Sequence, residues 1–362
     1  MVPSYAARRQ KLIAEMGVQS HQAVLATNPT DIHWLSGFTG SAGQVFIGSS
    51  DAFLITDGRY TERAAVEAPD IETFVPTKRG LAALFERLKG SQTRELLVDA
   101  THVTVALLRT LETAAQAEGL EVSALAFPTP ALRMAKDDYE VTALRRACAL
   151  SDAALAATIE QVRIGMTEKQ LAFLLETTMV EMGADARAFE SIVAAGEHSA
   201  IPHHSPTDRP LQRGDLLKID FGALAAGYHA DETRTFVLGE PEQWQIDIHA
   251  VVARSQQAGR DALRAGVSLQ EVDAASRTVI ADAGYAEFFM HGLGHGVGLQ
   301  IHEEPFFSPS STAILSAGNA VTIEPGIYLP GRGGVRIEDT LLVGQHDAES
   351  LTTTPRELRV LC

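Results

Sequence analysis

Two expected β-hairpins in the C-terminal part of the chain each carry a carboxylate on both strands, and this feature constrains the fold most. Strands at 215–221 and 228–238 form the first hairpin. If the chain bends after Ala225, Asp220 lies directly opposite Asp231, with the two Cβ atoms about 5 Å apart. Like charges at that separation destabilise a hairpin unless a cation lies between them. Taken alone, the pair is more simply explained as two surface aspartates near a turn.

The second hairpin, formed by strands at 320–324 and 334–343, repeats the arrangement. Glu324 and Glu338 are symmetric about the glycine-rich turn between these strands, so they are also expected to be cross-strand neighbours. Because side chains alternate between the two faces of a strand, Arg336 shares the face of Glu338. The recurrence favours a common site over two unrelated pairs of surface carboxylates.

A glycine- and histidine-rich segment at 291–305 separates the hairpins. Its four alternating glycines would each cost about 1 kcal/mol in a helix, so they indicate backbone that passes close to a ligand or another chain. The three histidines of this segment, His291, His295 and His302, are therefore expected in a functional site. A further pair lies between prolines in the loop 202–206, where His203 could also belong to an ordinary polar surface loop.

Four carboxylates and at least one imidazole form the ligand set that two divalent cations about 3.5–4 Å apart require. Oxygen-rich ligands favour Mn²⁺, with Co²⁺, Zn²⁺ and Fe²⁺ as alternatives. A water molecule shared by two such ions loses a proton near neutral pH and becomes a nucleophile. The sequence contains no nucleophile elbow, P-loop or dinucleotide-binding motif that would compete with this interpretation.

Composition narrows the class of protein. A length of 362 residues suggests about two domains, and 45% hydrophobic with 21% charged residues is typical of a soluble globular protein. The net charge of −16 argues against nucleic-acid or anionic-membrane partners. Two cysteines, Cys148 and Cys362, do not suggest a disulfide framework. Because no secretory signal or apolar run of about 18 residues is present, we expect a cytoplasmic protein without membrane contact.

The chain is expected to divide into a mixed α/β domain at 1–130 and a larger domain at 131–362, with a linker at 127–130. In the second domain, strands and helices come in blocks, which favours α+β over a doubly wound sheet. The remaining expected strands are 23–27, 44–48, 52–56 and 95–99, and the expected helices are 81–89, 103–117, 137–159, 168–182, 243–265 and 269–283.

Several motifs together resemble the Xaa-Pro peptidases of the pita-bread fold, namely prolidase and aminopeptidase P. The resemblance implies a smaller N-terminal creatinase-type α/β domain followed by a pita-bread metallopeptidase domain. The motifs are DFG at 220–222, DETRT at 231–235, HGLGH at 291–295, EPGIY at 324–328 and GVRIED at 334–339, with weaker N-terminal signals in LSGFTGS at 35–41 and TDGRY at 56–60.

The resemblance also implies a role for each ligand residue. Asp220 would bind one metal, His295 and Glu324 the other, and Asp231 and Glu338 would bridge both. A hydroxide bridging the two metals would attack the carbonyl before proline, with Glu324 as general acid and base.

Other roles follow from the same resemblance. His291 and His302 would lie around the scissile bond and hold the substrate and its developing charge. His203 would line the proline side of the pocket. Arg336 and Tyr328 match positions that support the ligands and the substrate, and Arg336 would orient the carboxylates and offset their charge.

Within this family, prolidase activity on Xaa-Pro dipeptides is our prediction, because the chain is short. Aminopeptidase P activity on longer Xaa-Pro-Yaa peptides is the alternative. A methionine-aminopeptidase-like enzyme, a metal-free creatinase and a non-enzymatic binding relative fit less well. A dipeptidase must recognise the free carboxylate after proline, and Arg59, Arg209 and Arg332 are unranked candidates. The resemblance further implies a homodimer.

Overall fold

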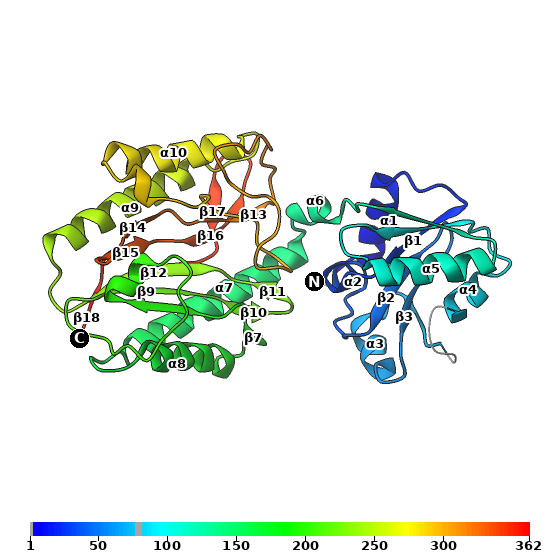
Figure 1. Ribbon diagram of the computed structural model, residues 1–362, viewed down its shortest axis with the longest axis horizontal. Helices are drawn as coiled ribbons and strands as arrows, with labels where there is room; N and C mark the ends of the chain where they lie inside the picture. The colour runs from blue at the N-terminus through cyan, green and yellow to red at the C-terminus, as the bar shows by residue number, and fades with distance from the viewer. Residues whose placement is uncertain (1–2, 77–81) are drawn as a thin grey trace. The chain divides into compact units, whose positions relative to one another are not determined.

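The computed structural model describes residues 3–76 and 82–362. The chain forms two compact units, Val2–Leu132 and Arg133–Cys362. Figure 1 shows the helices and strands of each unit.

The N-terminal unit is built on a six-stranded mixed sheet with strand order β4-β3-β2-β1-β5-β6. The strands β1, β2 and β3 pair antiparallel, while the flanking pairs are parallel. The four strands expected from the sequence are confirmed as β1, β2, β3 and β5, whereas β4 and β6 were not expected. The strand bounds are β1 Gln22–Ala26, β2 Gly43–Ile47, β3 Ala52–Thr56, β4 Glu72–Phe74, β5 Glu95–Asp99 and β6 Glu121–Leu125.

Two helices of this unit, α4 and α5, bury apolar side chains against the sheet in one core that includes Phe46, Phe53 and Leu111. They correspond to the helices expected at 81–89 and 103–117, although residue 81 lies outside the described residues. The helices of the unit are α1 Tyr5–Glu15, α2 Pro29–Ser36, α3 Thr61–Glu67, α4 Ala82–Leu88 and α5 Val105–Ala117.

The expected linker at 127–130 is partly helical, because Thr129 and Pro130 begin α6 (Thr129–Met134). Proline lacks an amide hydrogen, which is tolerated in the first turn of a helix since that donor has no partner within the helix. The next helix, α7 (Asp138–Ile159), starts at Asp137 with a capping box to Glu140.

The C-terminal unit places its strands between two pairs of helices, α7 with α8 and α9 with α10 (Figure 1). One apolar core joins α7 and α8 to β8, β9 and β12, and another joins α9 and α10 to β13–β16. No helix in the described ranges is long and apolar enough to cross a membrane. The helices are α8 Glu168–Glu181, α9 Gln243–Ala262 and α10 Leu269–Asp282, with short 3₁₀ turns at Gly196–Ala200 and Ala286–Phe288.

The strands of this unit form several small sheets, of which the largest has the order β18-β12-β9-β8. The strand bounds are β7 Ala186–Arg187, β8 Ile192–Ala195, β9 Leu216–Phe221, β10 Ala223–Ala225, β11 Tyr228–His229, β12 Glu232–Leu238, β13 Ala320–Ile323, β14 Gly326–Leu329, β15 Gly333–Arg336, β16 Asp339–Val343, β17 Ala348–Ser350 and β18 Val360–Leu361.

The register expected for the first hairpin is wrong by two positions. The turn is formed by Ala226 and Gly227, both at positive φ, so that Asp220 pairs with Thr233 rather than with Asp231. A shift of two residues keeps each side chain on its face of the strand. Asp220 and Asp231 are therefore diagonal neighbours on one face, and the expected proximity survives the incorrect register.

The register expected for the second hairpin is confirmed. Arg336 pairs with Gly326, and Asp339 pairs with Ile323, so the same alignment holds on both sides of Glu324 and Glu338. The strands are interrupted at these two glutamates. Glu338 instead forms an isolated bridge with Thr233, which joins the second hairpin to the first.

Close backbone packing within the first hairpin predicts that residue 222 must be glycine. A Cβ atom on Gly222 would lie 1.8 Å from the backbone oxygen of Ala230. We expect Gly222→Ala to destabilise the folded state by at least about 1–3 kcal/mol, because the hairpin backbone must move to accept the methyl group. Thermal and urea unfolding would measure the change. Gly58→Ala, whose Cβ would meet nothing within 4 Å, is the control; equal stability of the two variants would contradict the prediction.

Candidate active site

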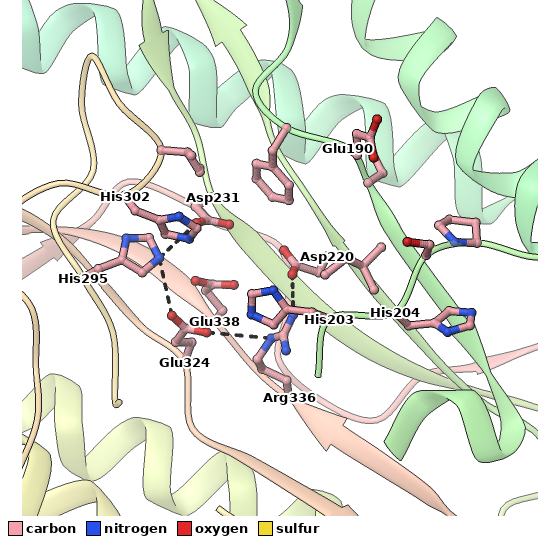
Figure 2. A pocket seen from close by; sticks show the side chains of 16 residues that line it. Glu190, His203, His204, Asp220, Asp231, His295, His302, Glu324, Arg336 and Glu338 are labelled. Atoms are coloured by element: carbon pink, nitrogen blue, oxygen red, sulfur yellow. Dashed lines mark hydrogen bonds and ion pairs between the residues drawn. The ribbon is translucent and has the colours of Figure 1, made fainter. Parts of the chain in front are cut away.

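The interrupted hairpins and the glycine-rich segment surround a cavity of about 290 Å³ (Figure 2). An adjoining cavity of about 330 Å³ adds His291 and shares five lining residues with the first, namely His203, His295, His302, Glu324 and Arg336. Of the residues singled out from the sequence, the structure brings together at these cavities Asp220, Asp231, His295, Glu324, Glu338, His203, His291, His302 and Arg336.

The imidazole of His295 is oriented toward the carboxylates. Its Nδ1 atom lies 3.0 Å from the backbone oxygen of Gly296, and its Nε2 atom lies 3.5 Å from a carboxylate oxygen of both Asp231 and Glu324. Ligand-type atoms of Asp231, His295 and Glu338 all lie within 4.8 Å of one another. When Nδ1 donates to the carbonyl, the lone pair of Nε2 faces the carboxylates, as a metal ligand requires.

Glycines allow this close packing. A Cβ on Gly294 would lie 2.1 Å from the oxygen of Thr322, and one on Gly296 would lie 2.2 Å from the oxygen of Glu304. The backbone of the glycine-rich segment therefore runs against β13 and against the segment that follows His302. This contact explains the alternating glycines as a packing requirement next to the site.

The clustered carboxyl groups of the cavity are in an environment that disfavours their ionised form. Burial, followed by the repulsion of neighbouring carboxylates, raises the pKa of Asp231 and of Glu338 well above the usual value. Burial together with Asp220, opposed by Arg336, raises the pKa of Glu324 to about 8.

Two carboxylate oxygens, Oδ1 of Asp220 and Oε1 of Glu338, are buried without a hydrogen-bond partner among the described residues. Burial lowers the pKa of His295 to about 4, which keeps its imidazole neutral. Unpartnered buried oxygens beside a neutral imidazole are costly for a protein alone and suited to divalent cations. The residues present thus fit a metal site, and the donor set does not specify which metal.

Arg336 offsets part of the negative charge from one side. Its guanidinium is paired with Asp220 and donates to Thr233 Oγ1 at 3.0 Å, to the oxygen of Pro202 at 3.2 Å and to the hydroxyl of Tyr328 at 3.0 Å. Tyr328, expected at the substrate, is fully buried and lines neither cavity. Its hydroxyl lies 2.9 Å from Nε2 of His291, so Tyr328 links that histidine to Arg336.

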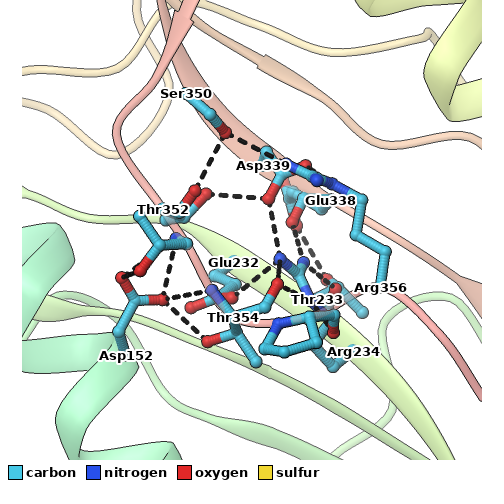
Figure 3. A network of polar contacts seen from close by, with 12 residues as sticks. Asp152, Glu232, Thr233, Arg234, Glu338, Asp339, Ser350, Thr352, Thr354 and Arg356 are labelled. Atoms are coloured by element: carbon cyan, nitrogen blue, oxygen red, sulfur yellow. Dashed lines mark hydrogen bonds and ion pairs between the residues drawn. The ribbon is translucent and has the colours of Figure 1, made fainter.

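A second layer of polar contacts, not predicted from the sequence, lies behind Glu338 (Figure 3). Arg234 donates to the backbone oxygens of Thr233 and Glu338, and to Asp339 Oδ1 at 2.7 Å. Thr233 Oγ1 donates to Glu338 Oε2 at 2.7 Å. Arg356 also pairs with Asp339. Three of these residues lie close to ligand-type residues in the DETRT and GVRIED motifs, namely Thr233, Arg234 and Asp339. That proximity is the signal in the sequence that could have identified them.

None of the arginines proposed for the substrate carboxylate lines the two cavities. Arg209 is paired with Asp215 at 2.7 Å, Arg332 lies 4.2 Å from the ring centroid of Trp244, and both line a separate pocket. Arg59 belongs to the N-terminal unit, where it pairs with Asp57. Among the described residues that line the cavities, Arg336 carries the only guanidinium.

Known proteins resemble the chain over its full length. An Xaa-Pro dipeptidase from Pyrococcus furiosus is 34% identical over 360 residues, which cover 97% of this chain and 99% of that protein. The solved structure of an Xaa-Pro dipeptidase from Bacillus anthracis has a TM-score of 0.93 at 34% identity, covering 99% of both chains. An X-Pro aminopeptidase from Thermotoga maritima has a TM-score of 0.92 at 35% identity, covering 98% of this chain and all of that one.

Two family descriptions match successive parts of the sequence. Residues 8–135 match the Creatinase/Prolidase N-terminal domain, and residues 142–345 match Metallopeptidase family M24. The match confirms the expected order of a creatinase-type domain followed by a pita-bread catalytic domain. The chain belongs to metallopeptidase family M24 and carries a creatinase/prolidase N-terminal domain.

Proposed function

We propose that the protein hydrolyses the Xaa-Pro bond of short peptides with the help of two divalent cations, and that Xaa-Pro dipeptides are its preferred substrates. The observation that supports this most is the cluster of four carboxylates and one neutral imidazole at a cavity of substrate size. Relatives named Xaa-Pro dipeptidase, at 33–34% identity over nearly the whole chain, support the choice of substrate.

In this proposal Asp220 would hold one ion, His295 and Glu324 would hold the other, and Asp231 and Glu338 would contribute to both. Mn²⁺ is our first choice, with Co²⁺, Zn²⁺ and Fe²⁺ as alternatives. When bound, such ions supply Lewis acidity toward the scissile carbonyl and make a water molecule acidic. Arg336 keeps Asp220 oriented, and Thr233 does the same for Glu338.

Proton transfer falls to Glu324, which is largely buried at the cavity wall. Its carboxylate takes a proton from the attacking water and returns it to the proline nitrogen as the bond breaks. An Xaa-Pro bond has no amide hydrogen, so an enzyme that relies on that donor loses a contact, whereas this cavity does not need one.

Imidazoles surround the proposed scissile bond. Burial and the neighbouring His203 lower the pKa of His302, which keeps its ring neutral and able to donate a hydrogen bond to the carbonyl oxygen. Burial lowers the pKa of His291 to about 3, and its Nε2 atom contacts Tyr328. His203 lies at the side of the cavity where we place proline, near Ile192 and Pro206.

Aminopeptidase P activity is the second candidate, and one observation favours it. Because the only guanidinium among the described cavity residues is already paired with Asp220, the free carboxylate of a dipeptide would meet imidazoles instead of an arginine. The adjoining cavity also has an apolar rim at Phe306, which is 47% exposed and offers a place for a longer peptide.

The homodimer and the cytoplasmic location stay predictions. Size-exclusion chromatography with light scattering would measure the first, and cell fractionation the second.

Substrate length distinguishes the two candidates. We expect kcat/KM for Ala-Pro, Met-Pro and Leu-Pro to exceed that for the same peptides extended by one residue by roughly ten-fold or more. The reason is that one charge-assisted hydrogen bond to the terminal carboxylate contributes about 1.5–3 kcal/mol. If the extended peptides are hydrolysed equally well or better, aminopeptidase P activity replaces our proposal.

Metal removal tests the proposed cations. Exhaustive chelation should abolish hydrolysis and lower the Tm, because the empty site keeps its buried carboxylates without compensation. Adding Mn²⁺ should restore both, whereas mock addition of buffer should restore neither. Activity and Tm are measured beside the metal content. Full activity in protein shown to contain no metal would rule the proposal out.

Two substitutions separate ligand from substrate roles. Glu338→Gln should lower the metal content, since it weakens a residue that contacts both ions. His302→Ala should retain both ions and lose mainly kcat, by about 10²–10³-fold, if its ring stabilises charge in the transition state. Metal analysis and steady-state kinetics measure the two effects, and the reverse pattern would invert our assignments.

A further inference from the structure

The loop 201–207 carries His203 into the cavity and has no helix or strand of its own. His203 is exposed at the cavity and lies over the carboxylates, whereas the ring of His204 turns away from them (Figure 2). A side chain on such a loop has no ladder of backbone hydrogen bonds to define its position. Its position depends on what holds the loop at each end.

The start of the loop is held by a buried lysine. Lys218 lies in β9 two residues before Asp220, and its side chain is 0% exposed. Its Nζ atom donates to the backbone oxygens of Ile201 at 2.6 Å and of Pro202 at 3.3 Å. The amine also lies 5.1 Å from the ring centroid of Tyr328. A buried amine is costly unless it is hydrogen-bonded, and these two carbonyls are the partners that the structure supplies.

Arg336 strengthens the same end of the loop. Its Nη1 atom donates to the oxygen of Pro202 at 3.2 Å while its Nη2 atom pairs with Asp220. The carbonyl immediately before His203 is thus shared between Lys218 and a residue that also contacts a proposed metal ligand. The loop is thereby tied to the same group of side chains as the carboxylates.

The end of the loop is held by a buried carboxylate. Glu168, the first residue of α8, is 0% exposed. Its Oε2 atom accepts hydrogen bonds from the backbone nitrogen of Thr207 at 2.9 Å and from the Thr207 hydroxyl at 2.7 Å, and lies 2.9 Å from Nε2 of His204. Its Oε1 atom accepts from the nitrogen of Ala195 at 2.9 Å and lies 3.0 Å from Nδ1 of His198.

These contacts also explain why Glu168, His198 and His204 need no cation, although their spacing resembles a metal site. Burial alone would raise the pKa of Glu168, but the hydrogen bonds from His204, Thr207 and Ala195 outweigh it and lower the pKa to about 2. Both oxygens of this ionised carboxylate are already occupied by donors. The cluster is therefore satisfied by the protein itself and serves as an anchor.

We propose that Lys218 and Glu168 are positioning residues that hold the two ends of the loop 201–207 and so set the place of His203 at the substrate. The proposal rests on the proposed function in that His203 contacts the peptide. In the proposed function His203 contacts the substrate and takes no part in proton transfer. A displaced loop should therefore weaken substrate binding more than it slows the chemical step.

The first experiment compares Lys218→Met with Lys169→Met in metal-loaded protein. Methionine keeps most of the apolar volume of Lys218 and removes its two hydrogen bonds. Lys169 is the exposed residue next to Glu168, and its side chain forms an ion pair with Asp208 at 2.9 Å. Its backbone nitrogen donates to the oxygen of Thr207 at 3.1 Å, a bond that the substitution keeps, so Lys169→Met is the matched control. We expect Lys218→Met to raise KM about ten-fold with kcat changed by less than about three-fold, and Lys169→Met to change neither. Loss of kcat alone, as a smaller folded fraction would cause, overturns the proposal.

A double-mutant cycle identifies the route of the effect. In a His203→Ala background, Lys218→Met should cause no further rise in KM, because the side chain through which it acts is gone. Additive effects would overturn the proposal. Metal content should equal that of the wild type, and a loss of metal would show instead that Lys218 acts through Asp220.

Hydrogen–deuterium exchange tests the anchors without relying on activity. Lys218→Met and Glu168→Gln should each raise exchange in a peptide covering 201–207, while Glu181→Gln, on the exposed end of α8, should not. Unchanged exchange in both anchor variants overturns the proposal. If exchange rises as expected but no Xaa-Pro peptide is hydrolysed by the wild type, the proposed function fails and the anchoring stands.

Discussion

Mutual repulsion among buried carboxylates is the constraint on which the catalytic unit depends. Asp220, Asp231 and Glu338 are each at most 7% exposed, and burial with repulsion raises the pKa of the latter two. An apolar interior would neutralise such groups unless something positive compensates them. Arg336 compensates from one side only. The rest of the unit therefore has to keep the carboxylates together against their repulsion while leaving one side of the cluster open to cations.

The two hairpins keep the carboxylates together. They also show which features of the site could be predicted from the sequence and which could not. Pairing in β9 and β12 is two positions away from the expected register, yet Asp220 and Asp231 still share a face. Alternation of side chains is a local property that a sequence displays directly. Register depends on the turn, and the positive φ angles of Ala226 and Gly227 could not be inferred from an alanine that normally avoids them.

What the sequence could not provide is the distance between elements far apart in the chain. Arg209 and Arg332 were reasonable candidates for the substrate carboxylate, but their nearest partners, Asp215 and Trp244, place them in another pocket. Conversely, side-chain alternation in the strand puts Lys218 on the same face as Asp220 but does not show how deeply its side chain is buried. Its complete burial results from the loop 201–207 folding over β9, and no periodicity in either segment predicts that contact.

Strand-borne and loop-borne groups at this site thus need different support. Backbone pairing with Thr233 fixes the positions of Asp220 and Glu338. Arg234 adds a hydrogen bond to the backbone oxygen of Glu338. His203 has no such pairing, and prolines at 202 and 206 restrict only the local backbone. A loop can be fixed from outside by hydrogen-bond donors and acceptors that are themselves immobile. Buried polar groups meet that condition because leaving them without a partner is costly. Lys218 and Glu168 hold this loop through such hydrogen bonds. Their contribution is to define one loop position relative to the carboxylates.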